Sequence, residues 1–371
     1  MTNYDYLVLS PIEFEDLTRD LLQKKTAHYF ESFTTGRDSG IDFRCSTVSN
    51  DKIVLQAKRY SSYSSLLKAL KNEVEKVVVL SPDRYVIAAT VGLTPKNKDI
   101  ILSMFSPYIK RTEDILGRDD LNNLISIYPE IEQKYYKLWL SSTKILNRIY
   151  NRKLFNQSDF ELENIQKQIK LYVQNDSFYD SIKILEKYSY VIISGLPGVG
   201  KTTLARMLVL HLLLKGYNDF IFLNESIEDG YKMFDQNKKQ IFFFDDFLCK
   251  NFINRESKTN EDSSITTFIE RIRESDNKYL IFTTREYILM QAMSEFEAFN
   301  INHIEIAKTI IDISSYTNLI KARILYNHVY FADVPNEYIF YLVKDKFYFK
   351  IIKHKNYNPR IIETIIKQKV W

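Results

Sequence analysis

Residues 190–203 read YVIISGLPGVGKTT, and this stretch decides the fold of the second half of the chain. It joins an apolar run typical of a buried strand to a glycine-rich turn, which leads into a helical run that ends at Gly216. Residues 195–202 match the pattern GxxxxGK[ST] in full, in the strand-to-helix context that the motif demands. The sequence therefore predicts a phosphate-binding loop in an α/β domain.

Each residue type in this loop has a chemical task. Glycines let backbone N–H groups turn inward around phosphates, and the helix N-terminus adds partial positive charge. Lys201 is predicted to bridge the β- and γ-phosphate oxygens, and the Thr202 hydroxyl to ligate Mg²⁺. The predicted nucleotide-binding residues of the loop are Gly195, Gly198, Gly200, Lys201, Thr202 and Thr203.

Two downstream strands end in polar residues. IFFFDD ends in Asp245, the predicted second Mg²⁺ ligand, and Asp246, which stands where many ATPases place a Glu that polarises the attacking water. FTTR ends in Arg285, at the carboxyl edge where a γ-phosphate would sit. Buried strands at 220–223, 240–244 and 279–283 alternate with helical stretches, which predicts a parallel sheet in a three-layer α/β domain.

This part of the chain, roughly 160–371, resembles the STAND NTPases, which are P-loop signalling switches. The resemblance rests on ISGLPGVGKTTLA, FFFDDF, TTRE and the later YNPR at 357–360. It implies ATP as the nucleotide, a closed resting state and ligand-triggered oligomerisation. It also implies that Arg285 senses the γ-phosphate and that Arg360, in a C-terminal lid, is a second sensor; a surface or capping role for Arg360 is the open alternative.

The first part of the chain has a compact α/β order. Helical periodicity over 11–24 is followed by short strand-like runs at 28–34, 40–45 and 52–58, which predict a meander of three strands. The rest of this order is a helix at 64–78, a strand at 84–89, a helix at 95–109 and a short strand at 114–116.

A second constellation lies in that meander. Asp42 follows a turn on one predicted strand, and Gln56 and Lys58 share one face of the next strand. Glu15, on the first helix, can add a third oxygen ligand for Mg²⁺, and Lys58 can position or deprotonate water and stabilise charge on a scissile phosphate. Phosphodiester hydrolysis fits this set.

The same residues, in PIEFEDL, GRDSGIDF and IVLQAKRY, resemble the Mrr-like branch of the PD-(D/E)xK restriction endonucleases over about 8–120. The resemblance implies a mixed sheet flanked by helices and includes a Gln in place of the middle acid. Because Gln56 is neutral, an inactive domain that only holds DNA stays open.

The predicted fold class is therefore α/β: a restriction-endonuclease-like mixed sheet plus a P-loop NTPase three-layer domain with a C-terminal helical lid. After Ile304 the chain is expected to be helical to its end. The predicted segments are a nuclease-like domain (1–120), a helical connector (121–160), the NTPase core (161–303) and a helical, winged-helix-like lid (304–371).

Composition narrows the classes of protein. With 45% hydrophobic residues and a net charge of +4, the chain is an ordinary folded protein rather than a disordered one. Its two cysteines lack metal or disulfide spacing, and we find neither a leader nor a membrane span, so we expect a cytoplasmic protein. Basic residues around Asp42, Gln56 and Lys58 suit either a phosphate backbone or a solvated face: Arg37, Lys52, Arg59, Lys68 and Lys71.

The sequence thus favours an ATP-controlled, metal-dependent endonuclease acting on double-stranded DNA. By resemblance, it would be a bacterial anti-phage defence factor that forms homo-oligomers in response to an unknown, possibly phage-derived, trigger. One alternative is a regulatory NTPase whose first domain binds DNA or a partner without cleaving; another is an ATP-dependent subunit of a restriction system. STAND switches normally carry a sensor domain after the lid. Here the sensor would be a separate partner, the nuclease domain or connector, or a segment that this sequence lacks.

Overall fold

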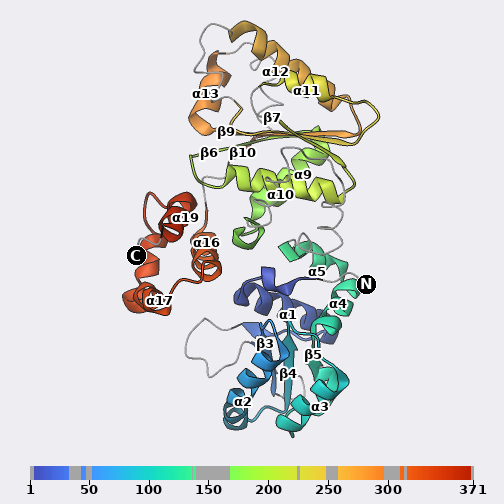
Figure 1. Cartoon of the computed structure of the whole chain (residues 1–371), viewed down its shortest axis with the longest axis vertical. Helices are drawn as coiled ribbons and strands as arrows, with labels where there is room; N and C mark the ends of the chain where they lie inside the picture. Colours follow the sequence, from blue (N-terminus) through green and yellow to red (C-terminus); the bar gives the residue numbers. More distant parts are fainter. Residues whose placement is uncertain are drawn as a thin grey trace. The chain divides into compact units, whose positions relative to one another are not determined.

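The computed structural model describes residues 4–32, 43–46, 52–135, 137–138, 168–223, 226–247, 258–295, 310–312 and 316–368. It divides into two compact units, Met1–Asn151 and Arg152–Trp371, which are described separately. Figure 1 shows a mixed α/β unit at the N-terminal end and a larger α/β unit that carries the C-terminal helices.

The first unit is built on a mixed sheet in the order β1-β2-β3-β4-β5. The first three strands are antiparallel neighbours, as the predicted meander requires, and β3, β4 and β5 run parallel. The strands are β1 (Glu31–Ser32), β2 (Phe43–Ser46), β3 (Lys52–Lys58), β4 (Arg84–Ala89) and β5 (Ile115–Leu116).

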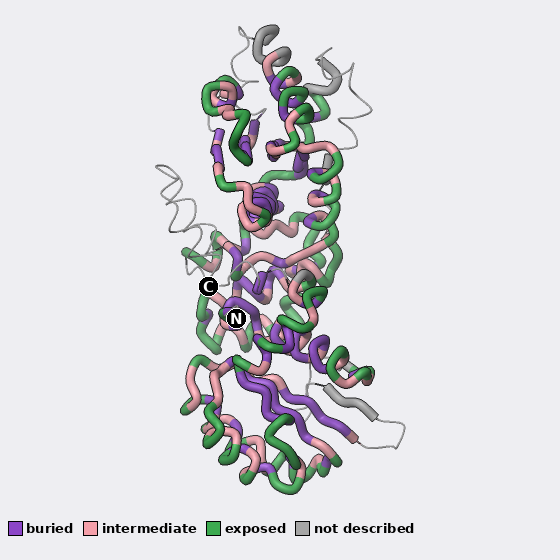
Figure 2. Tube along the Cα trace, turned by 90° about the vertical axis from the view of Figure 1, so that its right-hand side faces the viewer, coloured by how far each residue is buried: buried purple, intermediate pink, exposed green. Residues whose placement is uncertain are grey.

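Both faces of this sheet are covered, because its strands bury apolar residues on each side. Ile53 and Leu55 pack with α1 and α4, whereas Val54 packs with α2 and α3. Figure 2 shows the central strands of this sheet as buried. The helical elements of the unit are η1 (Tyr6–Val8), α1 (Pro11–Thr26), α2 (Tyr63–Leu80), α3 (Pro95–Met104), η2 (Thr112–Asp114), α4 (Arg118–Ile127) and α5 (Pro129–Lys134).

The first unit extends past residue 120, where the sequence analysis places the end of the nuclease-like domain. Leu121 and Ile125 of α4 are fully buried in the same core as Leu17 of α1. An ion pair of 2.9 Å between Lys137 Nζ and Glu13 Oε2 also connects the chain after α5 to α1. The predicted connector therefore begins inside this core, because its amphipathic helices have an apolar face to bury.

The second unit contains a wholly parallel sheet in the order β10-β6-β9-β8-β7. Every residue of β6 and β8 is buried, which explains why these strands read as continuous apolar runs rather than alternating ones. The strands are β6 (Tyr190–Gly195), β7 (Asp219–Leu223), β8 (Gln240–Phe244), β9 (Lys278–Arg285) and β10 (Ile310–Asp312).

Helices cover both faces of this sheet, with α9 and α10 on one side and α11, α12 and α13 on the other (Figure 1). This confirms the predicted three-layer arrangement. The helices are α9 (Asp176–Tyr188), α10 (Lys201–Leu214), α11 (Glu228–Met233), α12 (Lys258–Arg273) and α13 (Glu286–Glu295).

The C-terminal part forms a small helical lid around Leu325, Ile352 and Ile362. One expectation is wrong here: the chain is not wholly helical after Ile304, because β10 pairs in parallel with β6 and extends the sheet. Three residues are too few to show a strand periodicity in the sequence. The lid elements are α16 (Asn318–Phe331), α17 (Asn336–Val343), η3 (Lys344–Lys346), α18 (Phe347–Ile352) and α19 (Pro359–Lys367).

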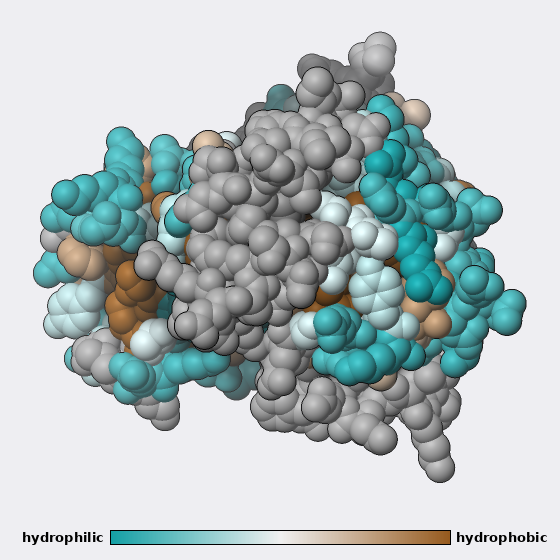
Figure 3. All heavy atoms as spheres, turned by 90° about the horizontal axis from the view of Figure 1, so that it is seen from above, coloured by the Kyte–Doolittle hydropathy of each residue, from teal (hydrophilic) through white to brown (hydrophobic). Residues whose placement is uncertain are grey.

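The described surface is mainly hydrophilic in the view of Figure 3, with smaller hydrophobic areas. Among the described residues, no helix has both the length and the apolar character needed to cross a membrane.

Candidate functional site

The glycine-rich turn joins β6 to α10 through backbone conformations that suit glycine. Gly198 and Gly200 have φ angles of +80° and +106°. A Cβ atom at position 198 would also lie 2.5 Å from Asn358 Oδ1. The turn therefore depends on glycine at position 198 both for its conformation and for the close approach of the lid.

Lys201 is the first residue of α10, and its side chain folds back over the turn. Its ammonium donates hydrogen bonds to the carbonyl oxygens of Gly195 and Leu196, at 3.1 and 3.0 Å. The residue is 9% exposed. The predicted phosphate-binding cation is thus held over the loop whose N–H groups surround a phosphate in this motif.

The predicted Mg²⁺ ligands lie together at the carboxyl edge of the sheet. The Thr202 hydroxyl donates to Asp245 Oδ1 at 2.9 Å, and the Thr283 hydroxyl donates to the same oxygen at 2.5 Å. A hydroxyl beside a carboxylate is a set of hard oxygen donors, so these residues fit Mg²⁺.

Asp246 and Arg285 lie next to this set. Asp246 has a φ of +55°, and its N–H donates to the Thr283 hydroxyl at 2.8 Å. Its Oδ2 lies 3.6 Å from Arg285 Nη2. The left-handed backbone at Asp246 is a costly conformation for a residue with a side chain, and it occurs where the Asp246 carboxylate lies beside Arg285.

The lid contacts the glycine-rich turn directly. Asn358 Nδ2 donates to the Pro197 carbonyl at 2.9 Å, and the Tyr316 hydroxyl donates to the Val199 carbonyl at 2.6 Å. The Arg360 N–H lies 3.4 Å from the Gly198 carbonyl. The start of α19 is therefore fixed against the loop that would hold phosphates.

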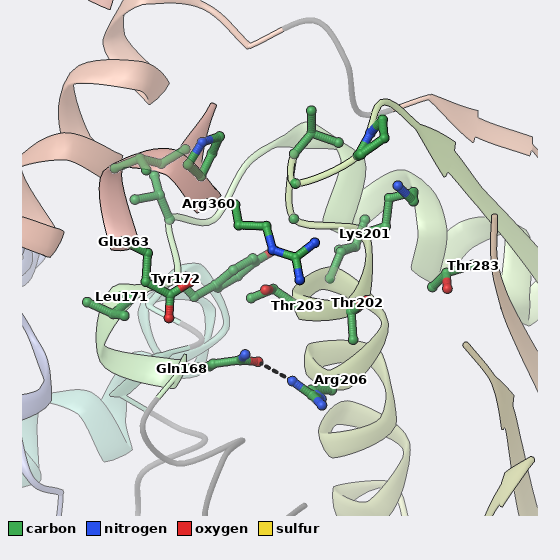
Figure 4. Close-up of a pocket in the computed structure, with 18 of the residues that line it drawn as sticks. Gln168, Leu171, Tyr172, Lys201, Thr202, Thr203, Arg206, Thr283, Arg360 and Glu363 are labelled. Atoms are coloured by element: carbon green, nitrogen blue, oxygen red, sulfur yellow. Dashed lines mark hydrogen bonds between the residues drawn. The ribbon is translucent and has the colours of Figure 1, made fainter. Parts of the chain in front are cut away.

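These elements enclose one pocket of about 480 Å³. Figure 4 shows Arg360 reaching in from α19, opposite Thr203 and Arg206 of α10, with Gln168 and Tyr172 on another wall. Gln168 Oε1 accepts a hydrogen bond of 3.1 Å from Arg206. The predicted residues that line this pocket are Gly198, Gly200, Lys201, Thr202, Thr203, Asp245, Asp246, Arg285 and Arg360.

Replacing Gly198 with Ala should release the lid. The new Cβ would collide with Asn358 and Arg360, and an overpacked contact of this kind costs about 1–2 kcal/mol, so we expect amide exchange in α19 to become about 5- to 30-fold faster. Hydrogen exchange read by mass spectrometry measures this. The control is Gly216→Ala, whose φ is +92° but whose Cβ would meet nothing within 4 Å. Equal exchange in both variants would contradict a specific lid contact.

The other constellation lies at the end of β3 in the first unit. Gln56 and Lys58 share the face of the sheet on which Val54 packs with α2, because strand side chains alternate. Phe43 of β2 pairs with Leu55, the neighbour of Gln56. Asp42 lies outside the described residues. The end of β3 is fixed by Thr90, whose N–H donates to the Lys58 carbonyl at 3.2 Å.

The structure adds Glu73 of α2, which the sequence analysis missed. Lys58 Nζ lies 3.2 Å from Glu73 Oε1, and Gln56 Nε2 donates to Glu73 Oε2 at 3.4 Å. The Tyr85 hydroxyl donates to Gln56 Oε1. Burial raises the pKa of Glu73, but the charge of Lys58 and the hydrogen bonds of Lys58, Lys76 and Gln56 together outweigh this effect and bring the pKa below its usual value.

Family models match both halves of the chain. Residues 7–96 match the model "Restriction endonuclease" (Mrr_cat), and residues 172–331 match the model "Novel STAND NTPase 3". The chain joins an Mrr-like restriction-endonuclease domain to a STAND NTPase domain.

An uncharacterized protein of Sinorhizobium fredii, y4cD, is 40% identical over 148 residues, which are 39% of this chain and 23% of that protein. The match therefore spans less than a quarter of that relative's length.

Solved structures match parts of this chain at low similarity. Caenorhabditis elegans PCH-2 (14% identity, TM-score 0.35) is matched over 61% of this chain and 66% of its own. A Walker-type ATPase of Pyrococcus abyssi (11% identity, TM-score 0.36) is matched over 54% of this chain and 68% of its own. The ORC2 protein of Aeropyrum pernix (12% identity, TM-score 0.30) is matched over 42% of this chain and 50% of its own.

In the endonuclease domain, Glu15 lies on α1, which packs on the sheet face opposite to Gln56 and Lys58. Among the described residues, no cluster of three His, Cys, Asp or Glu side chains could hold a metal ion. The predicted metal set of Glu15, Asp42 and Gln56 thus stays a prediction.

Two of the basic residues considered for DNA contact have structural partners. Arg59 donates to the carbonyls of Leu9 and Leu7, at 2.7 and 2.6 Å, and Lys52 donates to the Leu80 carbonyl at 2.7 Å. Their charges therefore hold β3 to neighbouring segments. Lys68 and Lys71 of α2 are exposed.

Proposed function

We propose that this chain is an ATP-controlled, metal-dependent endonuclease that cuts double-stranded DNA. The observation that carries the proposal is the pocket in which the P-loop, Asp245, Arg285 and the lid residue Arg360 meet, in a chain that also contains an endonuclease domain. Because the lid contacts the loop that would bind the nucleotide, binding or loss of the nucleotide can change the position of the lid.

In the NTPase domain, Lys201 would exchange the loop carbonyls for the phosphates of ATP. Thr202 and Asp245 would hold Mg²⁺, which supplies charge neutralisation for the phosphates. Arg285 and Arg360 would contact the γ-phosphate from the sheet and the lid. Because these contacts exist only with ATP bound, they would shift the population toward one lid arrangement. Asp246 would orient the attacking water, and its short side chain would keep hydrolysis slow.

In the endonuclease domain, Asp42 and Gln56 are the proposed environment of Mg²⁺, which would polarise the scissile phosphate when it is bound. Glu15 stays a prediction from the sequence, because α1 packs on the face of the sheet opposite to Gln56 and Lys58. Lys58, 14% exposed in its side chain, would stabilise the charge that builds on that phosphate. Pairing of two such domains in a homo-oligomer would cut both strands. From the resemblance to STAND switches, we also propose a bacterial anti-phage role and a phage-derived trigger.

The test is cleavage of plasmid DNA with Mg²⁺ in the absence of nucleotide, with ATP, and with a non-hydrolysable ATP analogue. We expect cutting with ATP and with the analogue, and little without nucleotide. Light scattering of the same samples should show larger particles when ATP is present. Specific DNA binding without cutting in all three samples would favour a regulatory NTPase with a binding domain. DNA-stimulated hydrolysis at many turnovers per second would favour a restriction-system subunit.

A further inference from the structure

We propose that Glu73 supplies the metal-ligating carboxylate of the endonuclease site, and that Gln56 positions it. This inference rests on the proposed nuclease function and adds a residue to it. The carboxylate comes from helix α2, which packs on the sheet face that carries Gln56 and Lys58.

The position of Glu73 on α2 calls for an explanation. Leu66, Leu70 and Val77 form the buried stripe of this helix, and residue 73 lies on the same stripe by helical spacing. The Glu73 side chain is accordingly only 13% exposed. An apolar side chain would satisfy packing there without the penalty of desolvating a carboxylate. A charge kept at such a position points to a task other than stability.

Both ends of the Gln56 side-chain amide make hydrogen bonds. Its nitrogen faces Glu73 Oε2, and its oxygen accepts a hydrogen bond from the Tyr85 hydroxyl. Gln56 is 1% exposed, so these two contacts fix the orientation of the amide. The atom that Gln56 turns toward Glu73 is therefore a donor and cannot ligate a cation.

This arrangement accounts for a glutamine at a position that can hold an acid in related nucleases. A second carboxylate at position 56 would face that of Glu73, and two like charges at hydrogen-bonding distance disfavour joint ionisation. With Gln56, Glu73 is the one carboxylate that the described part of the chain places at the end of β3, and it is held by an amide on one oxygen and by Lys58 on the other. The acid is supplied by the helix instead of by the strand.

The chemistry of this carboxylate suits a hard divalent cation. Carboxylate oxygens are the ligands that Mg²⁺ and Mn²⁺ prefer, and Glu73 places them beside Lys58, the proposed charge stabiliser. Glu73 also pairs with Lys76, at 3.2 Å, on the exposed side of the helix. Both lysines would remain near the bound metal and the phosphate.

The test measures Mn²⁺ binding to the full chain by electron paramagnetic resonance, without nucleotide and without DNA. To exclude the NTPase metal site, all proteins also carry Asp245→Asn. We expect Glu73→Gln to weaken Mn²⁺ binding at least about tenfold. The control is Glu75→Gln, an exposed acid on the same helix, which should leave binding unchanged. The double variant Gln56→Glu/Glu73→Gln returns a carboxylate to the site and should recover binding.

The outcomes separate the inference from the function on which it rests. Unchanged Mn²⁺ binding in Glu73→Gln would reduce Glu73 to a counter-ion for Lys58 and overturn the inference alone. Absence of Mn²⁺ binding in the parent protein would overturn the metal-dependent function as well. If Glu73→Gln fails to fold, as judged by circular dichroism, the double variant decides: a folded double variant that does not bind Mn²⁺ contradicts the inference.

Discussion

Replacing Lys58 with Ala is expected to slow plasmid cleavage at least about 100-fold. The Lys58 ammonium lies at the end of β3, 14% exposed in its side chain and paired with Glu73 at 3.2 Å. It is the cation that the proposal places beside the scissile phosphate, where negative charge builds in the transition state. Alanine removes that charge without filling its place. Initial rates of supercoiled plasmid loss, with Mg²⁺ and ATP, measure the effect.

The matched control is Lys25→Ala, which removes an exposed lysine from α1. A surface change of this kind is expected to alter the cleavage rate by no more than about twofold. ATP binding should be the same in both variants and in the parent, because Lys58 and the P-loop belong to different units. Cleavage retained in Lys58→Ala would place the chemistry elsewhere, and loss of ATP binding together with cleavage would contradict two separate sites.

Local signals in the sequence predicted the elements that carry both sites. VIISG followed by a glycine-rich turn predicts a buried strand and a helix start, and β6 and α10 meet at that turn. The strand predicted at 84–89 has the bounds of β4. In each case the deciding signal lies within a few residues of the element, where propensity and turn chemistry act.

Contacts between distant residues could not be predicted in this way. Asn358 meets the Pro197 carbonyl across 161 residues, and no local pattern encodes that meeting. Likewise, the amphipathic pattern of α4 shows that one face is buried, but not that it joins the core of the first unit. Glu73 is different: an acid on the apolar stripe of Leu66, Leu70 and Val77 is a readable signal, but it lies on a helix outside the two strands and the first helix that carry the predicted metal set.

Replacing Lys201 with Ala is expected to remove most of the stabilisation that ATP gives to the NTPase domain. The ammonium lies on the carbonyls of Gly195 and Leu196, at 3.1 and 3.0 Å, from which it can turn to the phosphates. Hydrogen bonds to charged groups contribute about 1.5–3 kcal/mol each, so the ATP affinity should fall about 10- to 100-fold.

Thermal unfolding in the presence of ATP measures this loss. At an ATP concentration of about 100 times the parent Kd, binding stabilises the folded parent by about 2.7 kcal/mol, whereas a variant with a 100-fold higher Kd gains only about 0.4 kcal/mol. For a domain of this size the corresponding shifts in Tm are about 5–10 °C and about 1 °C. Lys232→Ala, an exposed lysine of α11 paired with Asp229, should keep the full shift.

The same variant tests whether the nucleotide controls the nuclease. Lys201→Ala leaves the endonuclease domain and Lys58 intact, so any loss of cutting must come through the NTPase domain. With an ATP-controlled endonuclease, plasmid cleavage should fall to the rate seen without nucleotide and should rise again only when ATP exceeds the higher Kd. Cleavage that stays at the parent rate in Lys201→Ala, while the thermal shift is lost, would uncouple the two domains and refute control by ATP.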